Sequence, residues 1–359
     1  MTLAMKPARL DQDAIAATLK GQKLRVPDLT VHFRTWPSAR LHPSYEAVVP
    51  IMDAAIDRMA AAADESILRR KRDDLAALVC YFYPQASDED IETLALMMAW
   101  VVCWDDGVDA GEGDLANDFE GAERWRSRTL QIIRGALGID EAAPELLQVD
   151  PVNAVFQQFG DRLRQRSTAQ LRRRVYDGIH FYIESCGVEQ KLRLERCVPD
   201  YDSYMEFRLG TIGSDFFCSF IEFAIQETLP DRVVADVRKL SAHLGTALSL
   251  INDVLSLKKE LGTDCVINAV ATLLTPEKGL DGAVDEVNDK LGQAVADFDS
   301  VAGNLLARVE GDEALAAAVR KYIDGCRTLA TGLLAYTLSS PRYNLAKLLK
   351  EDGSLEITL

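Results

Sequence analysis

The sequence predicts an all-α protein, and two observations carry this prediction. Apolar residues recur with the period of an α-helix over long stretches of the chain, and no convincing alternation typical of β-strands appears. Proline and glycine lie between the periodic stretches, as expected for connections between helices. We therefore expect about ten to twelve helices packed in a single domain.

The stretch Tyr45–Met59 shows the helical pattern clearly, because Val48, Met52, Ile56 and Met59 fall on one face. Similar apolar stripes predict helices at Ile67–Phe82, Asp88–Trp104, Ala154–Leu163, Leu171–Ile183, Tyr201–Gln226, Arg232–Leu261, Val284–Val309 and Glu313–Leu334. Within Tyr201–Gln226, Gly210 and Gly213 predict a break in the helix.

The two ends of the chain lack such a stripe. Residues 1–25 mix charged and small side chains, so we expect a flexible N-terminus, and we expect the same of residues 351–359. The segment Leu24–His42 contains two prolines and two aromatic residues and is predicted to be an extended strap over the helices. Nothing marks a break in residues 26–350, which we expect to form one helical domain.

The composition excludes several classes of protein. A net charge of −16 argues against nucleic acid or an anionic membrane as a partner, so an anionic ligand would need local positive charge. The longest apolar stretch, Leu94–Trp104, is too short to span a bilayer, and the N-terminus lacks the apolar core of a signal peptide. The seven cysteines are scattered without a CxxC pair, which is typical of reduced thiols, so we expect a cytoplasmic protein.

The first candidate motif is acidic and ends an apolar run. Asp105, Asp106 and Asp109 follow the apolar stretch that begins near Leu94, and Asp105 and Asp109 are four residues apart. Alone, such a triplet is also typical of a solvated helix end or turn. Carboxylates near the C-terminus of a helix are disfavoured by the helix dipole, however, so this position calls for a compensating cation.

The second motif lies inside another apolar helix. Asn252, Ser256 and Glu260 are spaced four residues apart and would project from one helical face, with Lys259 beside Glu260. The alternative is a set of polar side chains that satisfy one another in a core helix. Oxygen-only ligands of this kind suit a hard cation such as Mg²⁺ rather than zinc or copper. Two such clusters facing one another would hold several Mg²⁺ ions and, with them, a diphosphate.

Together, the stretches DDxxD at residues 105–109 and NDxxSxxKE at residues 252–260 resemble the class I terpene synthases, with spacing most like the microbial sesquiterpene cyclases. Two further elements fit in order. Arg208 stands where that family keeps a diphosphate-sensing arginine, and Arg342-Tyr343 matches the Arg-Tyr pair of the family. The resemblance covers most of the chain.

The resemblance implies a helical bundle around a central apolar pocket and an Mg²⁺-dependent lyase. Asp105 would bind two metal ions, with Asp109 as a weaker ligand, and a further ion, in a set of about three, would be held by Asn252, Ser256 and Glu260. Asp106 would pair with Arg342 when the site closes. The residues implied to donate to the diphosphate are Arg208, Lys259, Arg342 and Tyr343, and Asn252 is implied to bind it as well.

The resemblance also implies the reaction: ionisation and cyclisation of farnesyl diphosphate to a sesquiterpene, with release of diphosphate. Geranyl and geranylgeranyl diphosphate are the alternatives within the same fold. Candidate aromatic residues for the pocket are Phe82, Trp100, Trp104, Phe207, Phe216 and Tyr336, whose alternative role is ordinary core packing. An aromatic residue often stands three positions before the acidic motif in the family, but here that place is Val102.

Two rival interpretations differ in function. A chain-elongating prenyl diphosphate synthase would carry a second Asp-rich motif and basic residues for a second diphosphate, and we find neither. A non-catalytic helical scaffold would be expected to have lost at least one member of the ligand set, which is complete here. A homodimer is expected only by analogy with the family.

Overall fold

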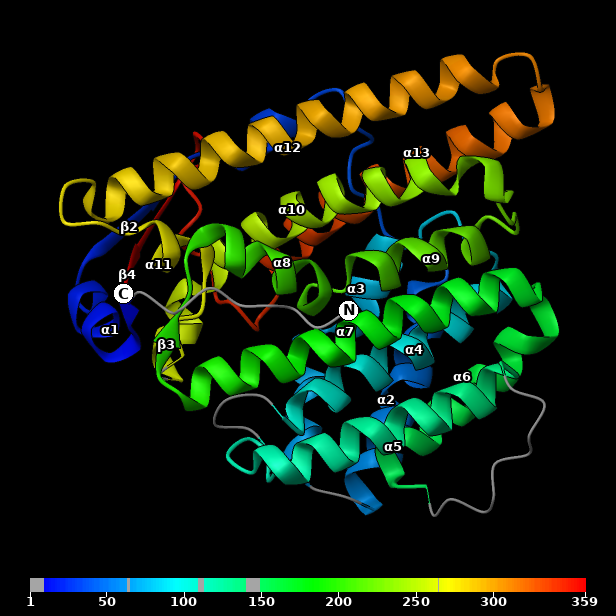
Figure 1. Cartoon of the computed structure of the whole chain (residues 1–359), viewed down its shortest axis with the longest axis horizontal. Helices are drawn as coiled ribbons and strands as arrows, with labels where there is room; N and C mark the ends of the chain where they lie inside the picture. The colour runs from blue at the N-terminus through cyan, green and yellow to red at the C-terminus, as the bar shows by residue number, and fades with distance from the viewer. Residues whose placement is uncertain (1–9, 63–64, 109–112, 140–148, 264) are drawn as a thin grey trace.

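A computed structural model describes residues 10–62, 65–108, 113–139, 149–263 and 265–359 (Figure 1). This part of the chain contains thirteen α-helices, two short 3₁₀-helices and four short strands, which confirms the predicted all-α fold class. The α-helices are α1 (Gln12–Leu19), α2 (Tyr45–Ala62), α3 (Leu75–Phe82), α4 (Asp88–Asp106), α5 (Phe119–Leu137), α6 (Pro151–Arg166), α7 (Ala169–Leu194), α8 (Tyr201–Thr211), α9 (Ser214–Ala224), α10 (Asp231–Gly262), α11 (Ala269–Leu273), α12 (Gly279–Val309) and α13 (Glu313–Ser339). The 3₁₀-helices are η1 (Leu29–Phe33) and η2 (Glu65–Asp73), and the strands are β1 (Leu10–Asp11), β2 (Lys23–Val26), β3 (Cys197–Val198) and β4 (Leu355–Thr358).

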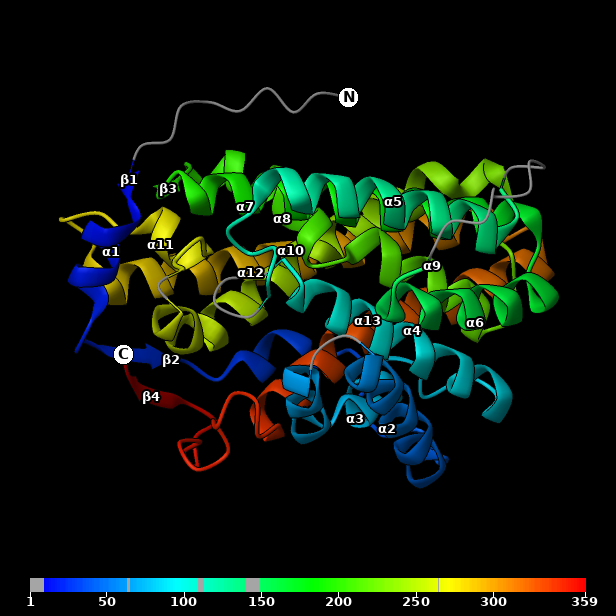
Figure 2. The same ribbon diagram turned by 90° about the horizontal axis from the view of Figure 1, so that it is seen from below.

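The helices that carry the two motifs lie on different sides of the bundle. Helix α4, which ends in the acidic motif, packs against α2, α3 and α6 and is buried over most of its length. Helix α10, which carries the second motif, packs along α12 and α13. The short helices α8 and α9 lie between α7 and α10, as both views show (Figures 1 and 2). One hydrophobic cluster connects these layers.

Three helices were missed by the sequence analysis. Helices α1 and α11 have 8 and 5 residues, too few to show a helical period. Helix α5 is longer, but charged residues interrupt its apolar stripe. The predicted helix Ile67–Phe82 was wrong in its first half, which forms the 3₁₀-helix η2. Asp74 then takes a left-handed conformation at φ 55° and caps α3 by accepting from the backbone N–H of Ala77.

The predicted break after Arg208 is confirmed. Helix α8 ends at Thr211, and Gly213 stands before α9 with φ at +73°. Only glycine adopts this left-handed conformation at little cost, and a Cβ there would lie 2.9 Å from the ring of Phe217. The chain therefore turns sharply directly after Arg208, and Thr211 and Ile212 lie on the wall of the cavity described below.

Both ends of the chain contain more structure than predicted. Residues 1–9 lie outside the described part, but residues 10–25 include α1, and β2 pairs with β4 in an antiparallel ladder from Lys23–Thr358 to Val26–Leu355. Within residues 351–359, for which we predicted a flexible tail, Leu355–Thr358 form β4. The reason is local: both short segments alternate buried and exposed side chains, which suits a strand packed on one face.

The predicted strap over the helices is confirmed by its contacts with α12. The indole N–H of Trp36 donates to both carboxylate oxygens of Asp299 at 3.0 and 3.1 Å, and its ring packs against Phe298. His32, on η1, also contacts α12: its Nε2 lies 2.9 Å from the side-chain oxygen of Asn288. The strap thus ties the N-terminal segment to the helix that supports α10.

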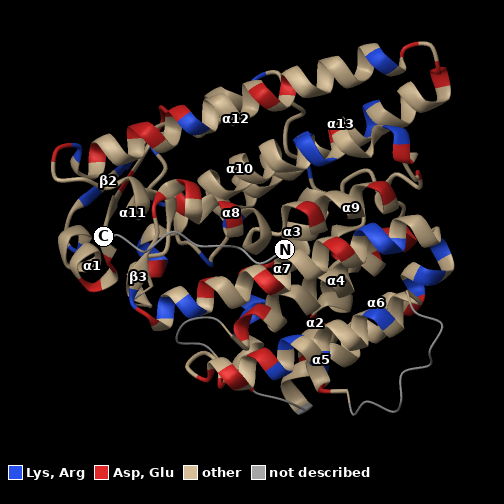
Figure 3. Ribbon diagram, in the orientation of Figure 1, with Lys and Arg blue, Asp and Glu red and all other residues tan. Residues whose placement is uncertain are grey.

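Charged residues of both signs are spread over the helices, and basic residues gather near one end of α6 and α7 (Figure 3). This basic run is largely paired: Arg166 bonds to Asp90, and Arg174 bonds to Glu222. No helix in the described part of the chain combines the length and the apolar character that crossing a membrane requires.

Candidate functional site

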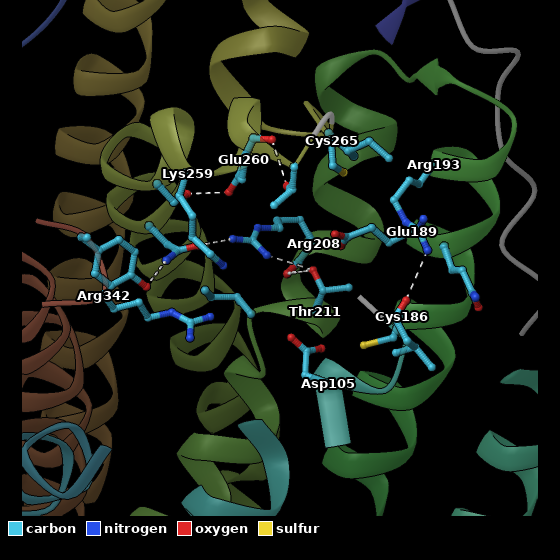
Figure 4. A pocket seen from close by; sticks show the side chains of 18 residues that line it. Asp105, Cys186, Glu189, Arg193, Arg208, Thr211, Lys259, Glu260, Cys265 and Arg342 are labelled. Atoms are coloured by element: carbon cyan, nitrogen blue, oxygen red, sulfur yellow. Dashed lines mark hydrogen bonds between the residues drawn. The ribbon is translucent and has the colours of Figure 1, made fainter. Parts of the chain in front are cut away.

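One cavity of about 210 Å³ brings the two motifs together (Figure 4). Its wall consists of α4, α7, α8 and α10, the segment after α10, and the segment that follows α13. Eight of the predicted site residues line it: Asp105, Arg208, Asn252, Ser256, Lys259, Glu260, Arg342 and Tyr343. Asp109, which was also predicted, lies outside the described residues. Residues far apart in the sequence therefore share one polar cavity.

The second motif forms a row of oxygen atoms along α10. Ser256 Oγ donates to Glu260 Oε1 over 2.5 Å, and the side-chain amide of Asn268 donates to Glu260 Oε2 at 2.8 Å. Asn252 Oδ1 accepts from Arg208 Nη2 at 2.8 Å, and its Nδ2 lies 3.4 Å from the hydroxyl of Tyr343. The four-residue spacing thus places an amide, a hydroxyl and a carboxylate on the same face of the helix, as helical geometry requires.

The carboxyl of Glu260 is poised to change its charge near neutrality. Burial, and next the nearby charge of Asp253, raise its pKa from 4.5 to about 7, while Ser256, Arg208 and Asn268 act in the opposite direction. A cation bound beside this carboxyl would favour its ionised form, so binding would release a proton wherever the group was still protonated.

Asp253, next to the first ligand of the row, was not predicted as a site residue. Its side chain is 1% exposed and accepts from Arg208 through Nη2 at 2.7 Å and Nε at 3.1 Å. The hydroxyl of Tyr204 and the backbone N–H of Ala269 donate to its other oxygen at 2.6 and 2.9 Å. Asp253 therefore fixes the guanidinium of Arg208 at the cavity wall, between α8 and α10.

Asp105 stands in the last turn of α4, half-buried at the cavity wall. The hydroxyl of Tyr182, from α7, donates to Asp105 Oδ1 at 2.8 Å. Burial, followed by the charge of Asp105, raises the pKa of Tyr182 well above its usual value, so this hydroxyl keeps its proton and remains a donor. Tyr182 is a second contact that the sequence analysis missed.

Asp106 points away from the cavity and is buried at 5% exposure. It is held by Arg70, through Nε at 2.6 Å and through Nη2, and Arg69 approaches to 3.3 Å. The same arginine, Arg70, donates from Nη1 to Asp73 at 2.8 Å, and Arg342 Nη1 donates to that carboxylate at 2.6 Å. Asp106 and Arg342, which we expected to pair on closure, are thus linked here through Arg70 and Asp73 instead.

Helix α7 supplies a wall of the cavity that the sequence analysis did not predict. Its lining residues are Cys186, Glu189, Gln190 and Arg193. They repeat at three- and four-residue steps, which is a recognisable helical row. The sequence analysis ended this helix at Ile183, before the row begins, because charged residues interrupt the apolar stripe there.

The six predicted pocket aromatics are all buried, but none of them lines this cavity. The indole N–H of Trp100 donates to Asn153 on α6 at 3.2 Å, and that of Trp104 donates to Thr129 on α5 at 3.1 Å. Trp104 also stacks on Trp125 with centroids 4.9 Å apart. These two rings pack between α4 and helices α5 and α6. They therefore have the alternative role considered above, which is packing in the core.

The donor set of the cavity fits a hard divalent cation. Carboxylate, amide and hydroxyl oxygens from α4 and α10 line the same space, and no thiolate–imidazole pair competes with them. Within the described ranges, no group of three His, Cys, Asp or Glu side chains could hold a metal ion by itself. Asn252 and Ser256 are therefore needed to complete a set of protein ligands around Glu260.

The sequence also matches a known family over this region. The family model described as "Terpene synthase family 2, C-terminal metal binding" matches residues 96–297, more than half of the chain, and this range contains both motifs. Among curated relatives, sesquiterpene cyclase hepA of Aspergillus oryzae is 25% identical, covering 96% of this chain and 96% of that protein. Terpene cyclase braA of Annulohypoxylon truncatum is 28% identical, covering 90% and 86%.

Solved structures with the same fold include a cucumene synthase variant, with a TM-score of 0.68 and 22% identity over 86% of this chain and 99% of that chain. The linalool/nerolidol synthase of Streptomyces clavuligerus in complex with 2-fluorogeranyl diphosphate aligns with a TM-score of 0.70 and 17% identity, covering 86% of this chain and 98% of that one. At these identities, the likeness shows the arrangement of helices.

Proposed function

Because the chain belongs to the terpene synthase family, we propose that it ionises and cyclises farnesyl diphosphate to a sesquiterpene and releases diphosphate. The observation that carries this proposal is the single cavity shared by Asp105, the α10 row and the basic residues. A relative that covers nearly all of the chain is named a sesquiterpene cyclase, which favours the C15 diphosphate over the C10 and C20 alternatives.

Asp105 on one wall and Asn252, Ser256 and Glu260 on the other would hold the Mg²⁺ ions. Bound Mg²⁺ draws electron density from a diphosphate and makes it a better leaving group. The number of ions, about three by resemblance to the family, belongs to this proposal. These ligands come from α4 and α10, so ions held by both would also bind the two helices to one another.

The basic residues of the cavity would bind the diphosphate directly. Arg208 is held in place by Asp253, and Lys259, Arg342 and the hydroxyl of Tyr343 line the same space. Hydrogen bonds from charged donors to phosphate oxygens are roughly twice as strong as neutral ones. As the carbon–oxygen bond breaks, negative charge grows on the leaving diphosphate, so these donors stabilise the transition state more than the bound substrate.

The carbocation left behind must be kept from water. The aromatic cluster next to the cavity is buried: Tyr182 bonds to Asp105 at one end and stacks on Phe216, with ring centroids 6.2 Å apart. Ring faces stabilise a nearby cation by about 0.5–2 kcal/mol each. We propose that the hydrocarbon chain lies on the side of the cavity next to Tyr182 and Phe216, although neither ring lines the cavity described above.

The test is product analysis of the purified protein by gas chromatography–mass spectrometry, after incubation with C10, C15 and C20 allylic diphosphates, with Mg²⁺ or with a chelator. We expect a cyclic C15 product that requires Mg²⁺ and is lost or altered in Asn252→Ala. Asn304→Ala, an exposed asparagine on α12, is the matched control and should keep the wild-type product. If only the C10 or C20 diphosphate is converted, the assigned substrate changes but the proposed reaction class stands. If none of the three diphosphates is converted, the result favours a non-catalytic scaffold.

A further inference from the structure

Arg193 is a buried cation on the α7 wall of the cavity, 9% exposed. Its Nη2 donates to the backbone carbonyls of Val108, at 3.3 Å, and of Ala116, and its Nη1 lies 3.5 Å from Asn117 Oδ1. All three partners are neutral. In Figure 4, Arg193 lies on the opposite side of the cavity from Lys259 and Arg342, with Arg208 between them.

This lack of a counter-charge distinguishes Arg193 from the other buried arginines. Three arginines in the described part of the chain are classed as buried, and two of them have carboxylate partners: Arg70 bonds to Asp106, and Arg126 bonds to Glu123. Arg193 has no ion pair with any described carboxylate. Burying an unpaired charge costs several kcal/mol, so its position calls for an anion that can enter the cavity.

The side chain also has donors to spare. A guanidinium carries five N–H groups, and the bonds of Arg193 use its Nη2 and, weakly, its Nη1. Its Nε has no partner among the described residues. Holding the segment after the acidic motif does not require this charge, because the neutral amide of Gln190 already donates to the carbonyls of Leu115 and Ala116 at 2.8 and 3.1 Å.

We propose that Arg193 is a further diphosphate-binding residue, supplied by α7 on the wall that faces Lys259 and Arg342. This inference rests on the proposed function, because the anion is the diphosphate of the substrate. Arg193 donates to a phosphate oxygen while it keeps the carbonyls of Val108 and Ala116. The anion is thereby connected to both ends of the segment that follows the acidic motif.

The experiment is isothermal titration calorimetry of inorganic pyrophosphate in saturating Mg²⁺ against four proteins: wild type, Arg193→Gln, Arg193→Lys and Arg126→Gln. Arg126 is the matched control, because it is also buried and bonds to Gln190 beside the same segment, but it does not line the cavity. We expect Arg193→Gln to raise the Kd roughly tenfold, which corresponds to about 1.4 kcal/mol. Arg126→Gln should keep the wild-type Kd and lose thermal stability.

Arg193→Lys tests the positive charge separately from the contacts with the backbone. Lysine keeps the charge but cannot donate to the carbonyls of both Val108 and Ala116. A Kd within roughly threefold of wild type, together with a lower melting temperature, supports the proposal. A Kd as weak as that of Arg193→Gln, or an unchanged Kd in both variants, overturns it and leaves Arg193 as a clamp for the segment. If the wild-type protein neither binds pyrophosphate nor yields a product, the proposed function fails first, and this inference fails with it.

Discussion

The substitution Asp253→Asn tests how the diphosphate end of the cavity is built. The Asp253 side chain is 1% exposed and that of Arg208 is 12% exposed, and the two groups share contacts of 2.7 and 3.1 Å. Asparagine keeps the shape but loses the charge, and its amide nitrogen cannot accept from Tyr204 or from the backbone of Ala269. Breaking a buried pair by neutralising one partner costs about 3–5 kcal/mol.

We expect the low end of that range, about 3 kcal/mol. Arg208 keeps two neutral acceptors, Asn252 Oδ1 at 2.8 Å and Thr211 Oγ1 at 3.1 Å, which offset part of the loss. The quantity to measure is the free energy of unfolding in urea, provided that two probes give coincident transitions. The control is Asp177→Asn, which removes an exposed pair with Arg173 and should cost less than about 0.5 kcal/mol.

A double-mutant cycle separates the pair from simple loss of packing. We expect Arg208→Met combined with Asp253→Asn to be less destabilising than the sum of the two single changes, with a coupling of at least about 1.5 kcal/mol. A cost below about 1 kcal/mol for Asp253→Asn, or additive single costs, would refute the reasoning that Asp253 holds a buried guanidinium.

Three further predictions concern other parts of the site. With a chelator present, the free energy of unfolding should fall as pH rises from about 4.5 to about 7, because folded Glu260 binds a proton that the unfolded chain has lost, and Glu260→Gln should remove this slope. Asp73→Asn should lower the free energy of unfolding by about 2 kcal/mol because Arg70 and Arg342 both lose their shared charged acceptor, whereas Asp57→Asn, at an exposed pair in the same region, should change it by less than about 0.5 kcal/mol. Gly213→Ala should cost about 1–2 kcal/mol through its left-handed backbone, and a neutral result in thermal denaturation would argue against the required turn.

Much of the site was predictable because it depends on geometry within one helix. Asn252, Ser256 and Glu260 repeat every four residues, so their common face follows from the sequence alone. Burial of the predicted aromatics was predictable in the same way. Their direction was not: Trp100 and Trp104 belong to an almost fully buried helix, and only the structure shows that they face α6 and α5.

What could not be predicted depends on pairing between distant elements. Arg70 belongs to a segment that looked helical and forms a 3₁₀-helix, and nothing in its local sequence indicates Asp106 as its partner. The α7 wall was missed for a simpler reason, because the apolar stripe that defined the helix ends before Glu189 and Arg193. Boundaries drawn from apolar periodicity omit a polar, cavity-facing end of a helix.

In both motifs, one residue lines the cavity and the next residue is buried and bonds to an arginine. Successive side chains on a helix point about 100° apart, so adjacent residues can contact different surroundings. In the acidic motif, Asp105 lines the cavity while Asp106 turns inward and is held by Arg70. The second aspartate thus fixes the end of α4 to the neighbouring segment, and the first one remains at the wall of the cavity.

The second motif repeats this arrangement and adds a return contact. Asn252 lines the cavity, Asp253 turns inward to neutralise Arg208, and Arg208 then donates back to Asn252 Oδ1. The buried carboxylate thus positions both a cation of the cavity and, through it, an oxygen of the α10 row. Behind the wall of the cavity, Asp253 neutralises the guanidinium of Arg208, whereas Asp106 neutralises Arg70, which does not line the cavity. The adjacent pairs Asp105-Asp106 and Asn252-Asp253 therefore each combine one side chain at the cavity with one buried carboxylate that holds a guanidinium.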